Sequence, residues 1–143
     1  MTFSIQRLFA PLLILVPVLV LAACGGTDTT STDGATAEKG ATLVKDNGCA
    51  GCHTPPSGAL LSGQEGSSIA GPNITPDKDT GIGSWTDAQI TAALRDGVDD
   101  DGKTLCSAMP KFSALSAEET ASIVLYLKSI PAVKRGLPEP TCQ

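Results

Sequence analysis

Three segments of the chain space their apolar residues at intervals of three and four, as the buried face of a helix requires. They span residues 37–47, 87–97 and 117–130. The residues expected to face inward are Leu43, Val44, Ile90, Ala93, Leu94, Ile123, Val124, Leu127 and Ile130. The pattern therefore predicts at least three helices and gives no comparable signal for strands.

Local signals mark the ends of the last two helices. Thr86 and Ser116 each stand three residues before a Gln or a Glu, which is the capping-box pattern. Gly97 and Pro131 stand where these helices are expected to end. Residues 55–84, in contrast, are rich in Gly, Pro, Ser and Asp and are expected to form a loop. A loop of this length is unusual in a compact domain unless it packs on something functional. The predicted fold class is all-α.

The first 23 residues have the features of an export signal. Arg7 precedes an apolar run over residues 8–21, which is followed by small residues. The run is shorter than a membrane-spanning helix requires. We therefore expect residues 1–23 to be a signal peptide and the chain to work outside the cytoplasm, on the periplasmic side of a bacterial cell envelope.

Leu21-Ala22-Ala23-Cys24 resembles the bacterial lipobox, at which the signal is removed and the cysteine is acylated. The resemblance implies a lipoprotein that is anchored to a membrane through acyl chains on Cys24. Residues 24–36 would be a flexible linker, because their composition offers little apolar surface to bury, and residues 37–143 would form one domain. The alternative is an ordinary secretory signal in which Cys24 has no role.

The charge of the chain bears on its partners. All 15 acidic residues but only nine of the ten basic residues follow the predicted signal, which leaves a net charge of −6. Such a surface does not favour nucleic acid or anionic lipid. A protein that docks by electrostatics is expected to present a basic face.

The most specific chemical motif is at residues 49–53. Cys49 and Cys52 are separated by two residues, and His53 follows directly. This Cys-x-x-Cys-His pattern is typical of covalent haem c attachment, in which both thiols form thioethers and the imidazole ligates the iron. A zinc site would need further ligands, and a redox dithiol would be expected in a βαβ pattern, which the sequence does not show. Only Trp85, Phe112 and Tyr126 supply aromatic rings after the signal, so a haem would add apolar bulk that the domain lacks.

Few residues can supply the second axial ligand. His53 is the single histidine of the chain, and Met109 is the one methionine after the signal. A His/Met pair gives a low-spin electron-transfer centre, so we predict that His53 and Met109 hold the iron. Met109 as a core residue and a Cys106 thiolate as ligand are the alternatives.

The order of these motifs resembles that of class I cytochromes c over residues 37–130. Gly40, the Cys-x-x-Cys-His motif, Gly71-Pro72-Asn73-Ile74, Met109-Pro110 and Tyr126 follow one another as they do in that family. Residues 71–86 are similar to those of cytochromes c that serve membrane-associated bacterial dehydrogenases, such as alcohol and gluconate dehydrogenases. The resemblance implies a small all-α fold of three to five helices, with long loops wrapped around one covalently attached haem.

The resemblance also implies roles for individual residues. The Pro72 carbonyl would accept the proton on the outer nitrogen of His53, and Trp85 would lie against the haem edge. Gly40 would leave room for Tyr126 where the first and last helices cross. Trp85 and Tyr126 as plain core residues remain the alternative.

Cys106 and Cys142 depart from a minimal cytochrome c. In an oxidising compartment two such cysteines usually pair. We predict a disulfide between them, which would hold the C-terminal tail across the segment that presents Met109. Two free thiols are the alternative.

These features predict a membrane-tethered electron carrier rather than an enzyme. It would pass one electron at a time from a dehydrogenase or quinol-oxidising complex to an oxidase or another cytochrome. A five-coordinate haem with a peroxidase or gas-binding role is the alternative, and a zinc-containing lipoprotein is a third hypothesis.

Overall fold

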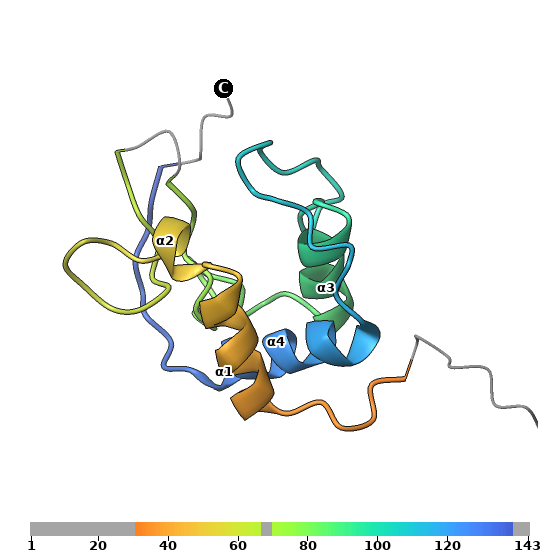
Figure 1. Ribbon diagram of the computed structural model, residues 1–143. Coiled ribbons are helices and arrows are strands. Elements are labelled where there is room, and N and C mark those ends of the chain that lie inside the picture. The colour runs from red at the N-terminus through yellow and green to blue at the C-terminus, as the bar shows by residue number, and fades with distance from the viewer. Residues whose placement is uncertain (1–30, 67–69, 139–143) are drawn as a thin grey trace, which may run out of the picture.

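The computed structural model describes residues 31–66 and 70–138, which fold into helices joined by long loops (Figure 1). The helices are α1 (Ala37–Asp46), α2 (Ala50–His53), α3 (Asp87–Arg95) and α4 (Ala117–Ser129). In this part of the chain the β-structure is limited to one isolated bridge, between Val98 and Thr104. None of the helices described here has the length and apolar content needed to cross a membrane. The predicted signal peptide, Cys24 and Cys142 lie outside the described residues.

The three predicted helices are confirmed with boundaries close to those expected. Both capping boxes are present, with Thr86 paired to Gln89 at the start of α3 and Ser116 paired to Glu119 at the start of α4. α3 ends before Gly97, whose φ of +70° suits a residue without a side chain. The described residues between α2 and α3 form a loop, as predicted.

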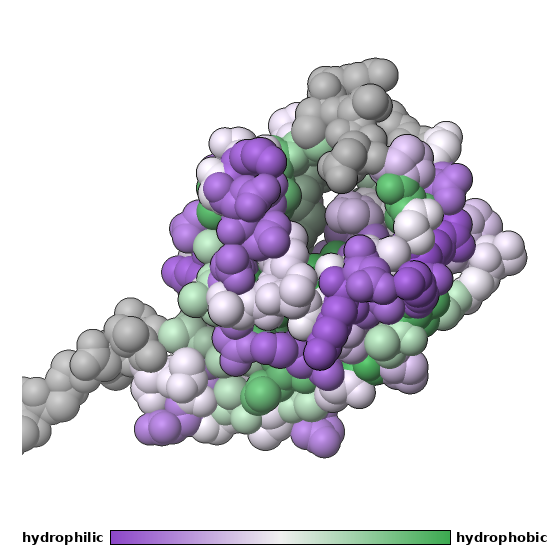
Figure 2. Space-filling view, turned by 180° about the vertical axis from the view of Figure 1, so that it is seen from behind, coloured by the Kyte–Doolittle hydropathy of each residue, from purple (hydrophilic) through white to green (hydrophobic). Residues whose placement is uncertain are grey.

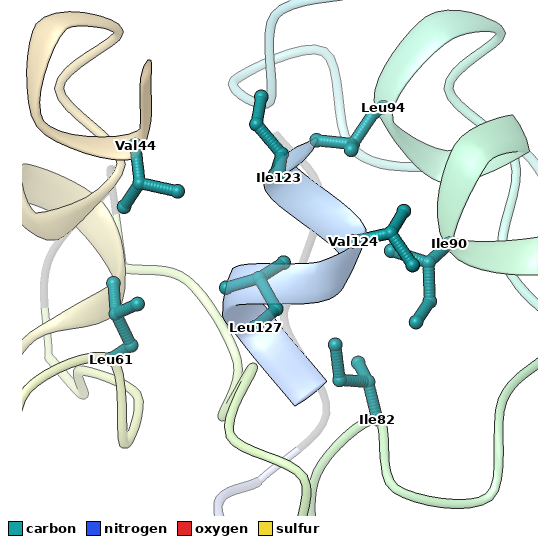
Figure 3. Packing of buried hydrophobic residues seen from close by; sticks show 8 residues of the cluster. All are labelled: Val44, Leu61, Ile82, Ile90, Leu94, Ile123, Val124 and Leu127. Atoms are coloured by element: carbon teal, nitrogen blue, oxygen red, sulfur yellow. The ribbon is translucent and has the colours of Figure 1, made fainter. Parts of the chain in front are cut away.

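α4 lies between α1 and α3 and connects the two sides of the domain (Figure 1). Ile123 and Leu127 of α4 lie between Val44 and Leu61 on the side of α1 and the residues of α3 (Figure 3). The buried hydrophobic core consists of Val44, Leu61, Ile82, Ile90, Leu94, Ile123, Val124 and Leu127. Leu43, Ala93 and Ile130, which the pattern placed inward, are only half-buried.

The buried core is entirely aliphatic. Trp85, Phe112 and Tyr126 are only partly buried and pack against its margin. Aromatic side chains normally supply much of the apolar area of a core. The protein part alone therefore leaves the interior short of apolar bulk, as the composition suggested.

Gly40 fixes how closely α1 and α4 approach. A Cβ atom at this position would lie 1.9 Å from the Ser122 carbonyl oxygen and 2.7 Å from the Cβ of Tyr126. No side chain larger than hydrogen fits there without moving the backbone of α4. The predicted meeting of Gly40 and Tyr126 is thus confirmed, and it explains the glycine inside a helix.

Replacing Gly40 with alanine should destabilise the protein strongly. Because the added methyl would overlap backbone atoms of α4, we expect Gly40→Ala to lower the free energy of unfolding by about 1–3 kcal/mol or more. Denaturant unfolding of the haem-loaded protein measures this loss. Gly136→Ala is the control, since its Cβ would meet only Thr80 Cγ2, at 3.9 Å. Equal stability of the two variants would contradict the close helix crossing.

Candidate functional site

The Cys-x-x-Cys-His motif forms the short helix α2. The chain turns at Gly48, which has a φ of +71°, and the Cys49 amide then donates a hydrogen bond to the Val44 carbonyl at 3.2 Å. The His53 amide donates to the Cys49 carbonyl at 3.1 Å. This single turn presents Cys49 and Cys52 as half-buried free thiols, beside His53.

The imidazole of His53 is buried and has a defined orientation. Only 5% of His53 is exposed, and its Nδ1 lies 2.8 Å from the carbonyl oxygen of Pro72. A carbonyl can only accept a hydrogen bond, so Nδ1 carries the proton and Nε2 of the neutral ring keeps its lone pair. This is the hydrogen bond that the family resemblance predicted. It leaves Nε2 as the nitrogen available to a metal.

Burial favours the uncharged forms of His53 and Cys49. It lowers the pKa of His53, an effect that the hydrogen bond to Pro72 only partly offsets. Burial also raises the pKa of the Cys49 thiol, and the nearby Cys52 adds to the rise. Near neutral pH the site therefore presents a neutral imidazole and a protonated Cys49 thiol.

Gly71 allows the following loop to approach this helix. A Cβ on Gly71 would lie 2.7 Å from both Cε1 and Nδ1 of His53, and 3.1 Å from the Cys52 carbonyl oxygen. The Gly71 amide donates to that same carbonyl at 2.8 Å. A glycine immediately before Pro72 is therefore a steric requirement of the His53–Pro72 hydrogen bond.

Met109 comes from the other side of the domain, in the segment between α3 and α4. It is half-buried and packs against the hydrophobic core, and its amide donates to the Cys106 carbonyl at 2.9 Å. The segment is fixed to α3 where the Leu105 amide donates to the Gly97 carbonyl and the Phe112 amide to the Leu94 carbonyl. These bonds make its position depend on α3 and the residues just after it.

The surface is hollowed between these two sides of the domain (Figure 2). α2 lies on one side of the domain, and α3 with the segment that carries Met109 lies on the other (Figure 1). Two free thiols, an oriented imidazole with its Nε2 unprotonated and a methionine in the segment on the other side are the kinds of group that hold a haem c. The aliphatic core, with its aromatic residues only at the margin, agrees with a bulky apolar group in this place.

The other residues predicted for the site have mixed outcomes. Trp85 is half-buried against the core, which is also what a plain core residue would show, so its contact with a haem edge stays a prediction. The free cysteines of the described residues are Cys49 and Cys52. Cys106 is not among them, and its predicted partner Cys142 lies outside the described part of the chain.

The sequence did not indicate the turn that follows His53. The Thr54 hydroxyl accepts a hydrogen bond from the Leu61 amide at 3.0 Å, and the Gly63 amide donates to the His53 carbonyl at 2.7 Å. Leu61 has a φ of +60° and is fully buried. Leu61 thus has a left-handed backbone conformation, which is more common for glycine or asparagine than for leucine.

Comparison with known proteins places this site in a family. The cytochrome c family model matches residues 37–131. A cytochrome c subunit of a quinone-type alcohol dehydrogenase from Gluconacetobacter polyoxogenes is 35% identical over 116 residues, which cover 75% of this chain. The cytochrome c subunit of gluconate 2-dehydrogenase from Pantoea cypripedii is 33% identical over 96 residues, or 62% of this chain. A diheme cytochrome c-type protein from Cereibacter sphaeroides is 30% identical over 113 residues, or 70% of this chain.

The matched relatives are much longer than the matched region. It covers 24% of the alcohol dehydrogenase subunit, 22% of the gluconate dehydrogenase subunit and 38% of the diheme protein. The similarity is therefore to a part of each relative.

A methyl group at position 71 should disturb the proximal side of the site. We expect Gly71→Ala to displace the His53 ring, because the new Cβ would overlap it, and to weaken the low-spin absorption spectrum of the haem-loaded protein. Gly51→Ala is the matched control, since its Cβ would meet nothing within 4 Å. Identical spectra for both variants would show that the ring tolerates the added group.

Proposed function

The chain belongs to the cytochrome c family, and we propose that it is a carrier of single electrons built on one haem c. Cytochromes c transfer electrons and do not themselves oxidise organic substrates. The observation that carries the proposal is the buried His53, which the Pro72 carbonyl orients within the attachment motif. The helix α2, which contains His53, lies across the domain from the segment that contains Met109 (Figure 1).

Each residue of the site has a distinct task in this proposal. The Cys49 and Cys52 thiols would form the two thioether bonds that prevent loss of the cofactor. His53 would hold the iron through Nε2, and Met109 would hold it through its sulfur. When bound, the haem supplies the couple between ferrous and ferric iron, at a potential that the Met/His pair raises. With both of these ligands supplied by the protein, no substrate would need to coordinate.

A single haem is the number that the sequence supports. The chain contains one Cys-x-x-Cys-His motif, and one histidine cannot serve two iron centres as proximal ligand. The diheme relative is longer than the region that this chain matches. One haem per chain is therefore part of the proposal.

The partners follow from the relatives and from the charge. Two of the relatives reported above are cytochrome subunits of dehydrogenases, so a dehydrogenase is the proposed donor. An oxidase or another cytochrome would be the acceptor. Because the chain after the predicted signal carries a net charge of −6, the docking face of a partner that uses electrostatics would be basic.

The remaining parts of the proposal concern how the domain is held. An acylated Cys24 would tether it to a membrane on the periplasmic side, through the linker that ends at residue 36. A disulfide between Cys106 and Cys142 would secure the tail near Met109. This pairing is supported by the state of Cys106, which is not a free thiol.

Carbon monoxide binding tests the axial ligands. We expect the reduced wild-type protein, with one haem per chain by pyridine haemochrome assay, to bind carbon monoxide poorly because Met109 fills the sixth position. Met109→Ala should open that position and bind the gas readily. Phe112→Leu is the control, since it changes the packing of the same segment without removing a ligand. The carrier proposal fails if the wild type binds carbon monoxide readily and Met109→Ala changes nothing, as a five-coordinate haem protein would behave.

Fractionation of bacterial cells tests the tether. The full-length protein should be found with the membranes, whereas Cys24→Ala should lack acyl chains and lose this association. Thr30→Ala, a change in the same linker, should behave as the wild type. A wild-type protein that remains in the soluble periplasmic fraction would refute the anchor and leave the haem proposal intact.

A further inference from the structure

After α4 the chain continues as an extended tail, residues 131–138, that runs back along the loop of residues 71–80. Its residues alternate in exposure: Val133, Arg135 and Leu137 are half-buried, whereas those between them are exposed. An extended segment turns successive side chains to opposite faces, so one face of the tail contacts the loop. Figure 1 shows this last, blue segment passing beside the loops near α2.

Besides the exposed Lys134–Asp79 ion pair, the tail contacts the loop through hydrogen bonds to buried or half-buried groups. The Val133 amide donates to Thr75 Oγ1 at 3.1 Å, and the Val133 carbonyl accepts from Asn73 Nδ2 at 2.7 Å. The Arg135 amide donates to Thr80 Oγ1 at 2.9 Å. Three loop side chains are thus fixed by the backbone of the tail.

Asn73 and Thr75 connect these contacts to Pro72. Asn73 is 3% exposed and Thr75 is fully buried. Asn73 Oδ1 accepts from the Thr75 amide at 3.0 Å and from Thr75 Oγ1 at 2.8 Å, and Asn73 Nδ2 also donates to Thr80 Oγ1 at 3.1 Å. Asn73 directly follows Pro72, so the network holds the peptide whose carbonyl accepts the proton of His53.

Gly63 brings the tail and this loop against the segment that follows His53. A Cβ there would lie 2.3 Å from Leu137 Cδ1 and 2.7 Å from the Asn73 amide nitrogen. The Gly63 amide also donates to the His53 carbonyl at 2.7 Å. The tail, the loop and the His53 segment therefore meet at one point with no space between them.

We propose that the tail, residues 131–138, is a positioning element for the proximal ligand and thereby tunes the reduction potential. It acts through Thr75 and Asn73 to fix the Pro72 carbonyl against His53 Nδ1. Almost all of this tail lies beyond the residues that the family model matches, which end at 131. The inference rests on the proposed ligation of a haem by His53.

The expected direction follows from the electronics of the imidazole. A firm hydrogen bond from Nδ1–H makes the ring a stronger electron donor, which favours the oxidised iron. Loosening the Pro72 carbonyl weakens this bond. The reduction potential should then rise, and the Nδ1 proton should exchange faster with solvent.

The test compares Thr75→Val with Thr75→Ser in the full-length, haem-loaded protein. Valine removes the hydroxyl that joins Asn73 to Val133, whereas serine keeps it. We expect Thr75→Val to raise the reduction potential. It should also speed Nδ1 proton exchange, measured by NMR, by about two- to tenfold, because that is the effect of losing one hydrogen bond of ordinary net strength. Thr75→Ser should restore both values. Lys134→Ala removes an exposed ion pair between the tail and Asp79 but none of the backbone hydrogen bonds of the tail, so it should match the wild type.

A second variant covers the case in which Thr75→Val does not fold. Val133→Pro removes the N–H group that donates to Thr75 Oγ1 and keeps the carbonyl group of residue 133. It should raise the reduction potential and speed Nδ1 proton exchange, as Thr75→Val does. If Thr75→Val or Val133→Pro folds and retains the wild-type potential and exchange rate, the positioning role is overturned. If instead the wild type shows no low-spin His/Met haem, the proposed function has failed, which is a separate result.

Discussion

The hydrogen bond from His53 to the Pro72 carbonyl is the interaction around which the rest of the site is arranged. It selects the ring tautomer, and it requires the loop to approach α2 so closely that residue 71 must be glycine. Burial of the ring keeps it neutral despite this bond. A ligand with one free nitrogen is therefore built into the protein itself, before any cofactor is considered.

Two different kinds of packing hold the halves of the domain in place. On the α1 side, backbone meets backbone at Gly40, so the crossing with α4 has little freedom. On the α3 side, aliphatic residues of α3 and α4 interdigitate, and backbone hydrogen bonds fix the segment with Met109 to the end of α3. α4 belongs to both contacts. The separation of the two walls of the hollow thus depends on one helix.

Local signals explain which parts of this arrangement could be predicted. Apolar spacing and capping boxes are properties of adjacent residues, so α1, α3 and α4 were found with nearly correct ends. The His53–Pro72 bond was predicted only from the resemblance to cytochromes c. The contacts of Val133 could not be foreseen, because hydrogen bonds between segments some 60 residues apart leave no periodic pattern in the sequence. The turn at Leu61 could not be foreseen either, because a leucine does not signal a left-handed backbone conformation. Haem ligation and the acylation of Cys24 involve a haem and a lipid, which are not part of the polypeptide.

The start of the described chain also has a consequence for the helices that follow it. The Thr36 amide donates to the Ser122 hydroxyl at 3.3 Å, which fixes the approach to α1 against α4. Residues 31–36 therefore enter the domain beside the crossing of α1 and α4, on the side away from α2 (Figure 1). Any movement of the chain before residue 36 would reach this crossing first, and would reach α2 only through α1.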